Sequence, residues 1–186
     1  MRAHDDTDLT PPVTARDHAQ GPADAPLTLV QYGDYECPYT RRSLPIVAAL
    51  QRRLGGRLRF IYRNFPLTEI HPHALRAAEA AEAADAQGRF WPMHDELFAH
   101  QHALEDAQLR DHARAVGLDT ERFAHDMAAH AHLDRIRADV AGGRESGVQG
   151  TPTFFVNGVR HQGSYDVDPL LAAPTGATEE TTRVNE

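Results

Sequence analysis

The segment Leu27-Thr-Leu-Val-Gln-Tyr-Gly-Asp-Tyr-Glu-Cys-Pro-Tyr-Thr40 decides how this chain folds. Its first six residues are largely apolar or β-branched, which predicts a short buried strand over 27–32. A helix is predicted to follow, because Pro38 suits a first helical turn and apolar residues then recur at helical spacing. Gly55-Gly56 is expected to end this helix. Cys37, the only cysteine, therefore lies between a buried strand and a helix N-terminus.

The next segment, Leu58-Arg-Phe-Ile-Tyr-Arg-Asn-Phe65, predicts a second strand. Phe60 and Tyr62 alternate there with Ile61 and Arg63, so the two pairs should face opposite sides of a sheet. A strand, a helix and a strand in this order imply parallel pairing through a right-handed crossover.

The middle of the chain changes to a helical period, which predicts five helices. Their expected limits are Pro72 to near Gly88, a start at Pro92, about Asp106 to Val116, an N-cap at Asp119, and about Leu133 to a stop at Gly142-Gly143.

Strand character returns after these helices. Thr153-Phe-Phe-Val156 and Val159-Arg-His-Gln162 flank Asn157-Gly158, a pair that supplies the positive φ angles of a type I′ hairpin turn. A short helix over about 167–173 is expected to follow. The predicted order is therefore β-α-β, helices, β-β-α, an α/β fold.

Composition excludes several classes of protein. The 186 residues suit one domain, and 41% hydrophobic with 25% charged residues is ordinary for a globular chain. A single cysteine excludes an internal disulfide. All 19 basic residues are arginine, so there is neither a P-loop lysine nor a Schiff-base lysine. A net charge of -8 argues against nucleic acid as a partner.

The two ends differ from the rest of the chain in being polar. We expect a flexible N-terminal arm over 1–24, a folded domain over 25–173 with its helical insert at about 68–146, and a flexible tail over 174–186. The start has no secretory apolar region, and no run approaches the ~20 apolar residues of a membrane helix. The expectation is a cytoplasmic protein without membrane insertion.

Cys37 is the first candidate for chemistry. The unpaired N–H groups and dipole of a helix N-terminus favour a thiolate, which makes cysteines at such positions reactive. A lone buried cysteine is also commonly just a small hydrophobic residue. The neighbouring Glu36 would oppose ionisation if its carboxylate faced the sulfur.

Several separated motifs together resemble the DsbA-like branch of the thioredoxin superfamily, and especially the domains of this kind fused to sodium/proton antiporters. They are Val30-Gln-Tyr-Gly-Asp-Tyr-Glu-Cys-Pro-Tyr39, Arg63-Asn-Phe-Pro-Leu67, His71-Pro-His-Ala74, Gln87-Gly-Arg-Phe-Trp91, Met93-His-Asp95 and Gly147-Val-Gln-Gly-Thr-Pro-Thr-Phe-Phe-Val-Asn-Gly158. The resemblance covers roughly 17–173. It implies a thioredoxin fold, with β-α-β and β-β-α halves around a central mixed sheet and an all-helical insertion.

The resemblance also implies roles for individual residues. Cys37 matches the nucleophile of the family's C-x-x-C motif, and Pro38 and Tyr39 match its two tuning positions. Pro152 matches the family's cis-proline and Thr151 precedes it. In the family, the backbone before this proline pairs with an extended substrate segment.

Thr40 departs from the family pattern, which usually has its resolving cysteine at this position. We therefore expect a monothiol thiol–disulfide oxidoreductase that acts on protein or small-molecule disulfides, with no bound cofactor and with a low-molecular-weight thiol as co-substrate. The Thr40 hydroxyl is a candidate hydrogen-bond donor to the Cys37 thiolate. The alternatives are a redox-inactive module that binds a peptide or a partner, including a transporter, and a dimer linked through Cys37.

The histidines do not predict a metal site, because the clusters 94/100/102 and 125/130/132 are expected to lie mostly on solvated helix faces. His71 is the exception, since it follows the second strand. It is a candidate hydrogen-bond partner of the thiolate or of substrate, or else a helix-entry residue beside Pro72.

Overall fold

The computed structural model describes residues 8–172, and the strands in this range form one five-stranded sheet in the order β1-β3-β2-β4-β5. β2 (Leu27–Gly33) and β3 (Leu58–Asn64) pair in parallel, with Val30 opposite Ile61. α1 (Pro38–Leu54) connects them and is followed by a short 3-10 turn, η1 (Gly55–Arg57). The predicted strand–helix–strand unit is confirmed.

The second half of the fold adds antiparallel strands on the other side of β2. β4 (Thr153–Val156) pairs with β2, and β5 (Val159–Arg160) pairs with β4. Asn157 and Gly158 between them have φ angles of 47° and 83°, as the hairpin prediction requires. α7 (Val167–Ala172) closes the described chain. The order of strands and helices is that of a thioredoxin fold, and the predicted α/β class is confirmed.

Side-chain alternation along β2 and β3 divides the core between the two faces of the sheet. Leu29 and Phe60 pack into a large cluster that includes residues of α1 and α7, such as Leu50 and Leu170. Val30 belongs to a second cluster on the opposite face, together with Tyr32, Ile61, Phe65, Val148, Phe155 and Leu9. The predicted separation of Phe60 and Tyr62 from Ile61 is therefore correct.

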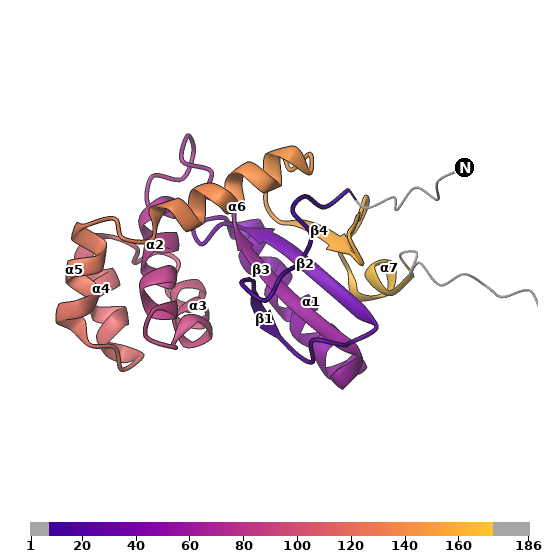
Figure 1. Cartoon of the computed structure of the whole chain (residues 1–186), viewed down its shortest axis with the longest axis horizontal. Coiled ribbons are helices and arrows are strands. Elements are labelled where there is room, and N and C mark those ends of the chain that lie inside the picture. Colours follow the sequence, from indigo (N-terminus) through magenta and orange to yellow (C-terminus); the bar gives the residue numbers. More distant parts are fainter. Residues whose placement is uncertain (1–7, 173–186) are drawn as a thin grey trace, which may run out of the picture.

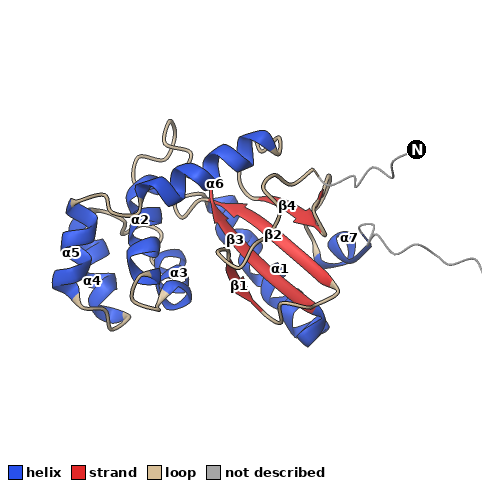
Figure 2. Cartoon of the chain, in the orientation of Figure 1, coloured by secondary structure: helices blue, strands red, loops and turns tan. Residues whose placement is uncertain are grey.

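A lobe of helices is inserted between β3 and β4. It comprises α2 (Ala74–Asp85), α3 (Phe90–Ala99), α4 (Asp106–Ala115), α5 (Thr120–Ala128) and α6 (Leu133–Glu145). Figures 1 and 2 show α2 to α5 beside the sheet, with α6 running from this lobe back toward β4. The Asp119 carboxylate caps α5 by accepting from the N–H groups of Glu121 and Arg122, which confirms the predicted N-cap.

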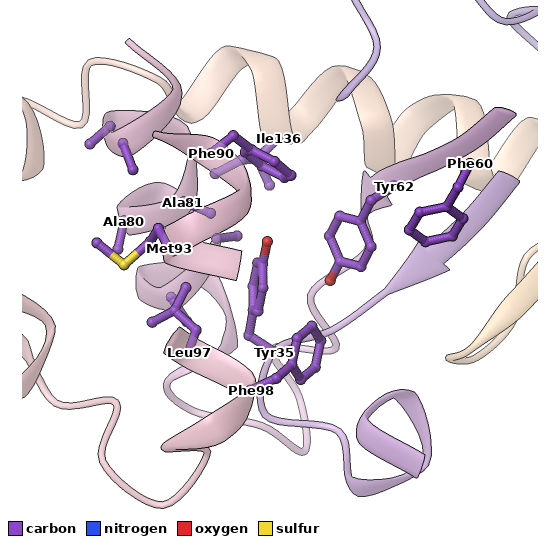
Figure 3. Close-up of a cluster of buried hydrophobic side chains, with 14 of the residues drawn as sticks. Tyr35, Phe60, Tyr62, Ala80, Ala81, Phe90, Met93, Leu97, Phe98 and Ile136 are labelled. Atoms are coloured by element: carbon purple, nitrogen blue, oxygen red, sulfur yellow. The ribbon is translucent and has the colours of Figure 1, made fainter. Parts of the chain in front are cut away.

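The lobe and the sheet share one continuous core. Figure 3 shows Tyr35 and Tyr62 facing Phe98, whose helix α3 also contributes buried Met93 and Leu97. The Tyr35 ring lies 4.8 Å from the Phe98 ring and 5.4 Å from the Tyr62 ring, measured between centroids. The loop that carries Cys37 is therefore anchored by an aromatic side chain two residues before it.

The prediction that Gly142-Gly143 ends the last helix of the insert is wrong, because α6 continues to Glu145. These glycines allow close packing instead. A Cβ atom at Gly142 would lie 2.7 Å from Pro11, and one at Gly143 would lie 2.8 Å from the Phe65 ring. Glycine inside a helix costs about 1 kcal/mol relative to alanine, and here that cost accompanies the close approach of neighbouring segments.

The expected flexible arm over 1–24 also needs correction for the residues that the structure describes. β1 (His18–Gln20) pairs antiparallel with β3, and Leu9 is only 4% exposed. The buried Arg63 guanidinium holds this segment by donating to the Asp17 carboxylate and to the Pro11 carbonyl. These contacts explain how a segment of polar composition packs onto the sheet. Residues 1–7 and the predicted tail over 174–186 lie outside the described range.

Candidate functional site

Cys37 lies at the carboxyl end of β2, where it is the N-cap residue of α1. Its Sγ atom is 3.3 Å from the Thr151 carbonyl oxygen, to which the S–H group donates, and the residue is 3% exposed. Pro38 begins the helix and has no N–H, so the N–H groups of Tyr39 and Thr40 are the first-turn donors without an intrahelical acceptor. These donors lie at the positive end of the helix dipole, which favours an anion.

Thr151 and Pro152 come to Cys37 from more than a hundred residues away because β4 pairs directly with β2. The peptide bond between them is cis. Both residues are half-buried, and the Thr151 hydroxyl oxygen is buried without a hydrogen-bond partner in the described structure. The pairing of β4 with β2 thus brings the predicted site residues Thr151 and Pro152 to Cys37.

Pro38 and Tyr39 form the exposed rim of the same site. Tyr39 is 56% exposed, and the Arg42 guanidinium lies 5.4 Å from the centre of its ring. Arg41 is exposed as well. A large aromatic ring open to solvent next to a cysteine is suited to contacting a second molecule.

Thr40 is fully buried beneath the loop. Its hydroxyl oxygen accepts from the Asp34 N–H at 3.4 Å, and among the described residues it makes no hydrogen bond to Cys37. The expected donation to the sulfur is therefore absent from this structure. Burial under the β2–α1 loop explains the difference, because the hydroxyl is turned toward the loop backbone.

Asp34 organises the loop around Cys37, and the sequence analysis did not single it out. Its buried carboxylate accepts from the N–H groups of Glu36 at 2.7 Å, Cys37 at 3.2 Å and Leu67 at 2.8 Å. The same oxygen that accepts from Leu67 lies 2.8 Å from the His71 Nδ1 atom. An aspartate that bonds to the backbone two and three residues ahead is a recognisable turn signal, so the sequence held a clue to this role.

The two further candidates, Glu36 and His71, both turn away from the sulfur. The Glu36 carboxylate accepts from the His73 N–H at 2.7 Å and contacts its Nδ1 atom at 2.9 Å. His71 contacts Asp34, as above, and so supports the loop from the β3–α2 connection. Among the described hydrogen bonds neither residue reaches Cys37.

Gln101, in the turn after α3, connects the helical insert to the site and was also missed. Its side-chain amide donates to the carbonyl oxygens of Tyr35 at 2.8 Å and Cys37 at 2.9 Å. The residue is 7% exposed. No local pattern marks such a glutamine, because both partners lie more than sixty residues earlier.

The expectation of solvated histidines is wrong for His94. This residue is 3% exposed, and the centroid of its ring lies 4.6 Å from that of Tyr62. Burial lowers its pKa to about 3, so the ring is neutral. His112, for which the sequence analysis made no prediction, is also buried. His102 and His125 are exposed, as expected.

None of the described helices is both long enough and apolar enough to cross a membrane.

The order of elements, the cysteine at the start of α1 and the facing Thr151–Pro152 pair define a DsbA-like thioredoxin fold. A family model described as thioredoxin matches residues 14–173, and the chain belongs to this family. The oxidised BdbD structure from Bacillus subtilis superposes with a TM-score of 0.75 at 23% identity, covering 83% of this chain and 89% of that one.

Two further relatives are closer in sequence. A thioredoxin-like oxidoreductase from Silicibacter pomeroyi DSS-3 is 30% identical, with a TM-score of 0.75, and covers 85% of this chain and 90% of that one. The protein named Na(+)/H(+) antiporter NhaA 1 from Salinispora arenicola is 50% identical over 171 residues. That match covers 91% of this chain and 26% of the antiporter, so the chain spans about a quarter of its length.

Proposed function

We propose that this chain is a monothiol thiol–disulfide oxidoreductase that attacks protein or small-molecule disulfides through Cys37. The observation that supports this most directly is the position of the Cys37 sulfur, at the N-terminus of α1 and 3.3 Å from the carbonyl that precedes Pro152. The helix end stabilises a thiolate, and the half-buried backbone beside it offers a place for an extended substrate.

The proposed reaction has three exchange steps. Cys37 gives its proton to solvent, and the thiolate attacks one sulfur of the substrate disulfide. This attack forms a mixed disulfide and releases the other sulfur as a thiolate. Thr40 provides no second thiol, so an external low-molecular-weight thiolate attacks the Cys37 sulfur of the mixed disulfide and releases the second substrate sulfur as a thiolate. A second external thiolate then attacks the external sulfur bonded to Cys37. This frees the Cys37 thiolate and leaves one disulfide of the two external thiols, which balances the two-electron reduction of the substrate.

The predicted residues that surround Cys37 each have a place in this proposal. Pro38 and Tyr39 form the rim that meets the substrate, and Thr151 and Pro152 form the backbone against which it lies. Thr40 supports the loop through Asp34 rather than through the sulfur. The cytoplasm is the proposed compartment, because its reduced thiols supply the resolving step.

A second candidate is a redox-inactive module that binds a peptide or a transporter. Thr40 favours it, because the buried hydroxyl fills the position of the resolving thiol and is satisfied by the loop backbone. The 50% identity to part of an antiporter motivates the transporter as partner.

The test is reaction of the purified chain with 2-hydroxyethyl disulfide, followed by intact mass and by rate against pH. We expect a single adduct on Cys37, a rate that rises with the thiolate fraction, and release of the adduct by added glutathione. Cys37→Ser is the control and should give no adduct. Absence of an adduct on the native chain, with partner binding retained in Cys37→Ser, would favour the second candidate.

A Thr40→Cys variant sharpens this test. If the loop geometry is that of a dithiol site, the new thiol should form a disulfide with Cys37 and release the adduct without glutathione. A variant that keeps the adduct as long as the native chain does would show that the site no longer supports exchange.

A further inference from the structure

The C-terminal end of α3 and the facing side of α4 hold a cluster of two histidines and one glutamate. Glu96, His100 and His112 each offer one ligand atom, and these atoms lie within 4.8 Å of one another. The Glu96 Oε1 atom is 2.9 Å from His112 Nδ1 and 3.1 Å from His100 Nδ1. The two imidazole rings stack, with centroids 5.1 Å apart.

The hydrogen bonding of His112 determines which nitrogen faces the cluster. Its Nε2 atom is 2.8 Å from the Ala103 carbonyl, which accepts only, so this nitrogen carries a proton. The other nitrogen, Nδ1, is aimed at the Glu96 carboxylate. A ligating histidine in proteins usually donates its second N–H to a carbonyl or carboxylate in this way, which fixes the ring.

We propose that Glu96, His100 and His112 bind a divalent late transition-metal ion, with Zn²⁺ as the representative. Two imidazole nitrogens and one carboxylate oxygen are a ligand set that zinc accepts, with solvent in the fourth position. Two ligands of a tetrahedral ion at about 2.0 Å from it lie about 3.3 Å apart, close to the separations found here. His100 is half-exposed, so its ring is free to leave the Glu96 carbonyl and bind through Nδ1.

A second histidine–carboxylate cluster, His18 with Glu82 and Asp85, does not share this arrangement. Both of its imidazole nitrogens already face carboxylates, at 2.8 Å and 3.5 Å, and the ring stacks 3.5 Å from the Phe90 ring. It forms an ion-pair network, whereas in the α3–α4 cluster one nitrogen is tied to a neutral carbonyl. The comparison supports the α3–α4 cluster as the metal site.

The position of the site gives the metal a connection to the loop of Cys37. Gln101 follows His100 directly and donates to the carbonyls of Tyr35 and Cys37. A metal bound to His100 therefore restrains the neighbour of Gln101, and Gln101 holds the loop.

The test is titration of the chelator-treated full chain with Zn²⁺ in a Cys37→Ser background, which removes the thiol as a competing ligand. We expect one Zn²⁺ per chain by calorimetry, a rise in the unfolding temperature, and a tetrahedral absorption spectrum with Co²⁺. His100→Ala, at an exposed position, should weaken binding at least about tenfold. His102→Ala and Asp85→Asn are matched controls that should bind as the parent does.

His112→Gln should also weaken binding, and circular dichroism would show whether this buried substitution still folds. The proposal is overturned if the parent binds no Zn²⁺, or if His100→Ala binds as tightly as His102→Ala. It is equally overturned if Asp85→Asn removes the binding, which would assign the ion to the His18 cluster.

Discussion

Two buried carboxylate networks in the molecule are built differently. At the Cys37 loop, the single carboxylate of Asp34 receives three backbone N–H groups and the His71 ring. At the junction between β1, β3 and the insert, Glu82 and Asp139 share the side-chain amide of Asn64, at 2.7 Å and 3.4 Å. One network has an excess of donors, and the other has an excess of carboxylates.

The two networks also differ in the kind of partner that holds their carboxylates. Three of the four contacts of the Asp34 carboxylate are with backbone N–H groups. The junction instead depends on His18, whose Nε2 atom is 2.8 Å from Glu82. Among the described residues, the cation that pairs with the Asp139 carboxylate is Arg135, at a long 3.5 Å. The loop therefore rests mainly on backbone donors, whereas the junction holds His18 and Asp139, two groups whose pKa values the fold raises.

The largest effect should come from Asp34→Ala. The change removes the side-chain acceptor of the Glu36 and Leu67 N–H groups, and each such loss costs about 1–3 kcal/mol. The Cys37 N–H keeps a second acceptor, the Asp34 backbone carbonyl at 3.1 Å. We expect urea unfolding to show a loss of about 3 kcal/mol or more, and the reaction of Cys37 with disulfides to slow as its loop loosens.

Glu36→Ala is the matched control for that change. Its carboxylate also accepts a backbone N–H, from His73, but it is more exposed, so its loss should cost about 1 kcal/mol. Asp34→Asn should fall between the two, because one oxygen remains. Equal losses for the two alanine variants would contradict the central role of Asp34.

The order of the elements could be predicted because the spacing of apolar residues distinguishes strands from helices along the chain. The strands around Val30 and Ile61 and the hairpin at Asn157-Gly158 have local signals. β1 has none, since it is three residues long and is defined only by pairing with β3. Gly142-Gly143 was misjudged because a helix stop and a close helix contact use the same residue.

The site could be predicted only in part, for a similar reason. Its place at a predicted helix N-terminus marked Cys37, and family resemblance added Thr151 and Pro152. The contact of Cys37 with Thr151 depends on pairing across the sheet. Asp34 carried a local turn signal that the sequence analysis did not use. Gln101 had no signal, since a long-range side-chain hydrogen bond to a backbone carbonyl leaves no spacing pattern.

The second largest effect should be a dependence of the unfolding free energy on pH, caused by His18 at the junction. Burial alone would lower the pKa of His18, but hydrogen bonds to Asp85 and Glu82 raise it to about 9. Because the folded value lies above the unfolded value of about 6.5, the contribution is complete below pH 6.5 and is lost as pH rises through about 9. We expect a loss of up to about 3 kcal/mol in unfolding free energy across this window.

His18→Gln should flatten this part of the profile, since glutamine does not titrate. His125→Gln is the control, because the His125 side chain is 81% exposed. A native profile that stays level between about pH 6.5 and 9 would contradict the charged state of His18.

The smallest effect should come from Asp139→Asn. Burial raises the pKa of Asp139 to about 6, against the lowering by Arg135 and by the Asn64 N–H. The folded value again exceeds the unfolded one, so the contribution is complete below about pH 4 and is lost as pH rises through about 6. At neutral pH the chain therefore buries a poorly paired charge.

In the native chain the Asn64 N–H lies 2.9 Å from the Asp139 carboxylate. Asparagine removes the charge and keeps an oxygen for that N–H. We expect the variant to be about 1 kcal/mol more stable than the native chain near pH 7.5, and the advantage to vanish near pH 4, in parallel urea titrations. A variant that is less stable at both pH values would mean that Arg135 uses the charge despite the long contact. The junction would then be as well satisfied as the Asp34 loop.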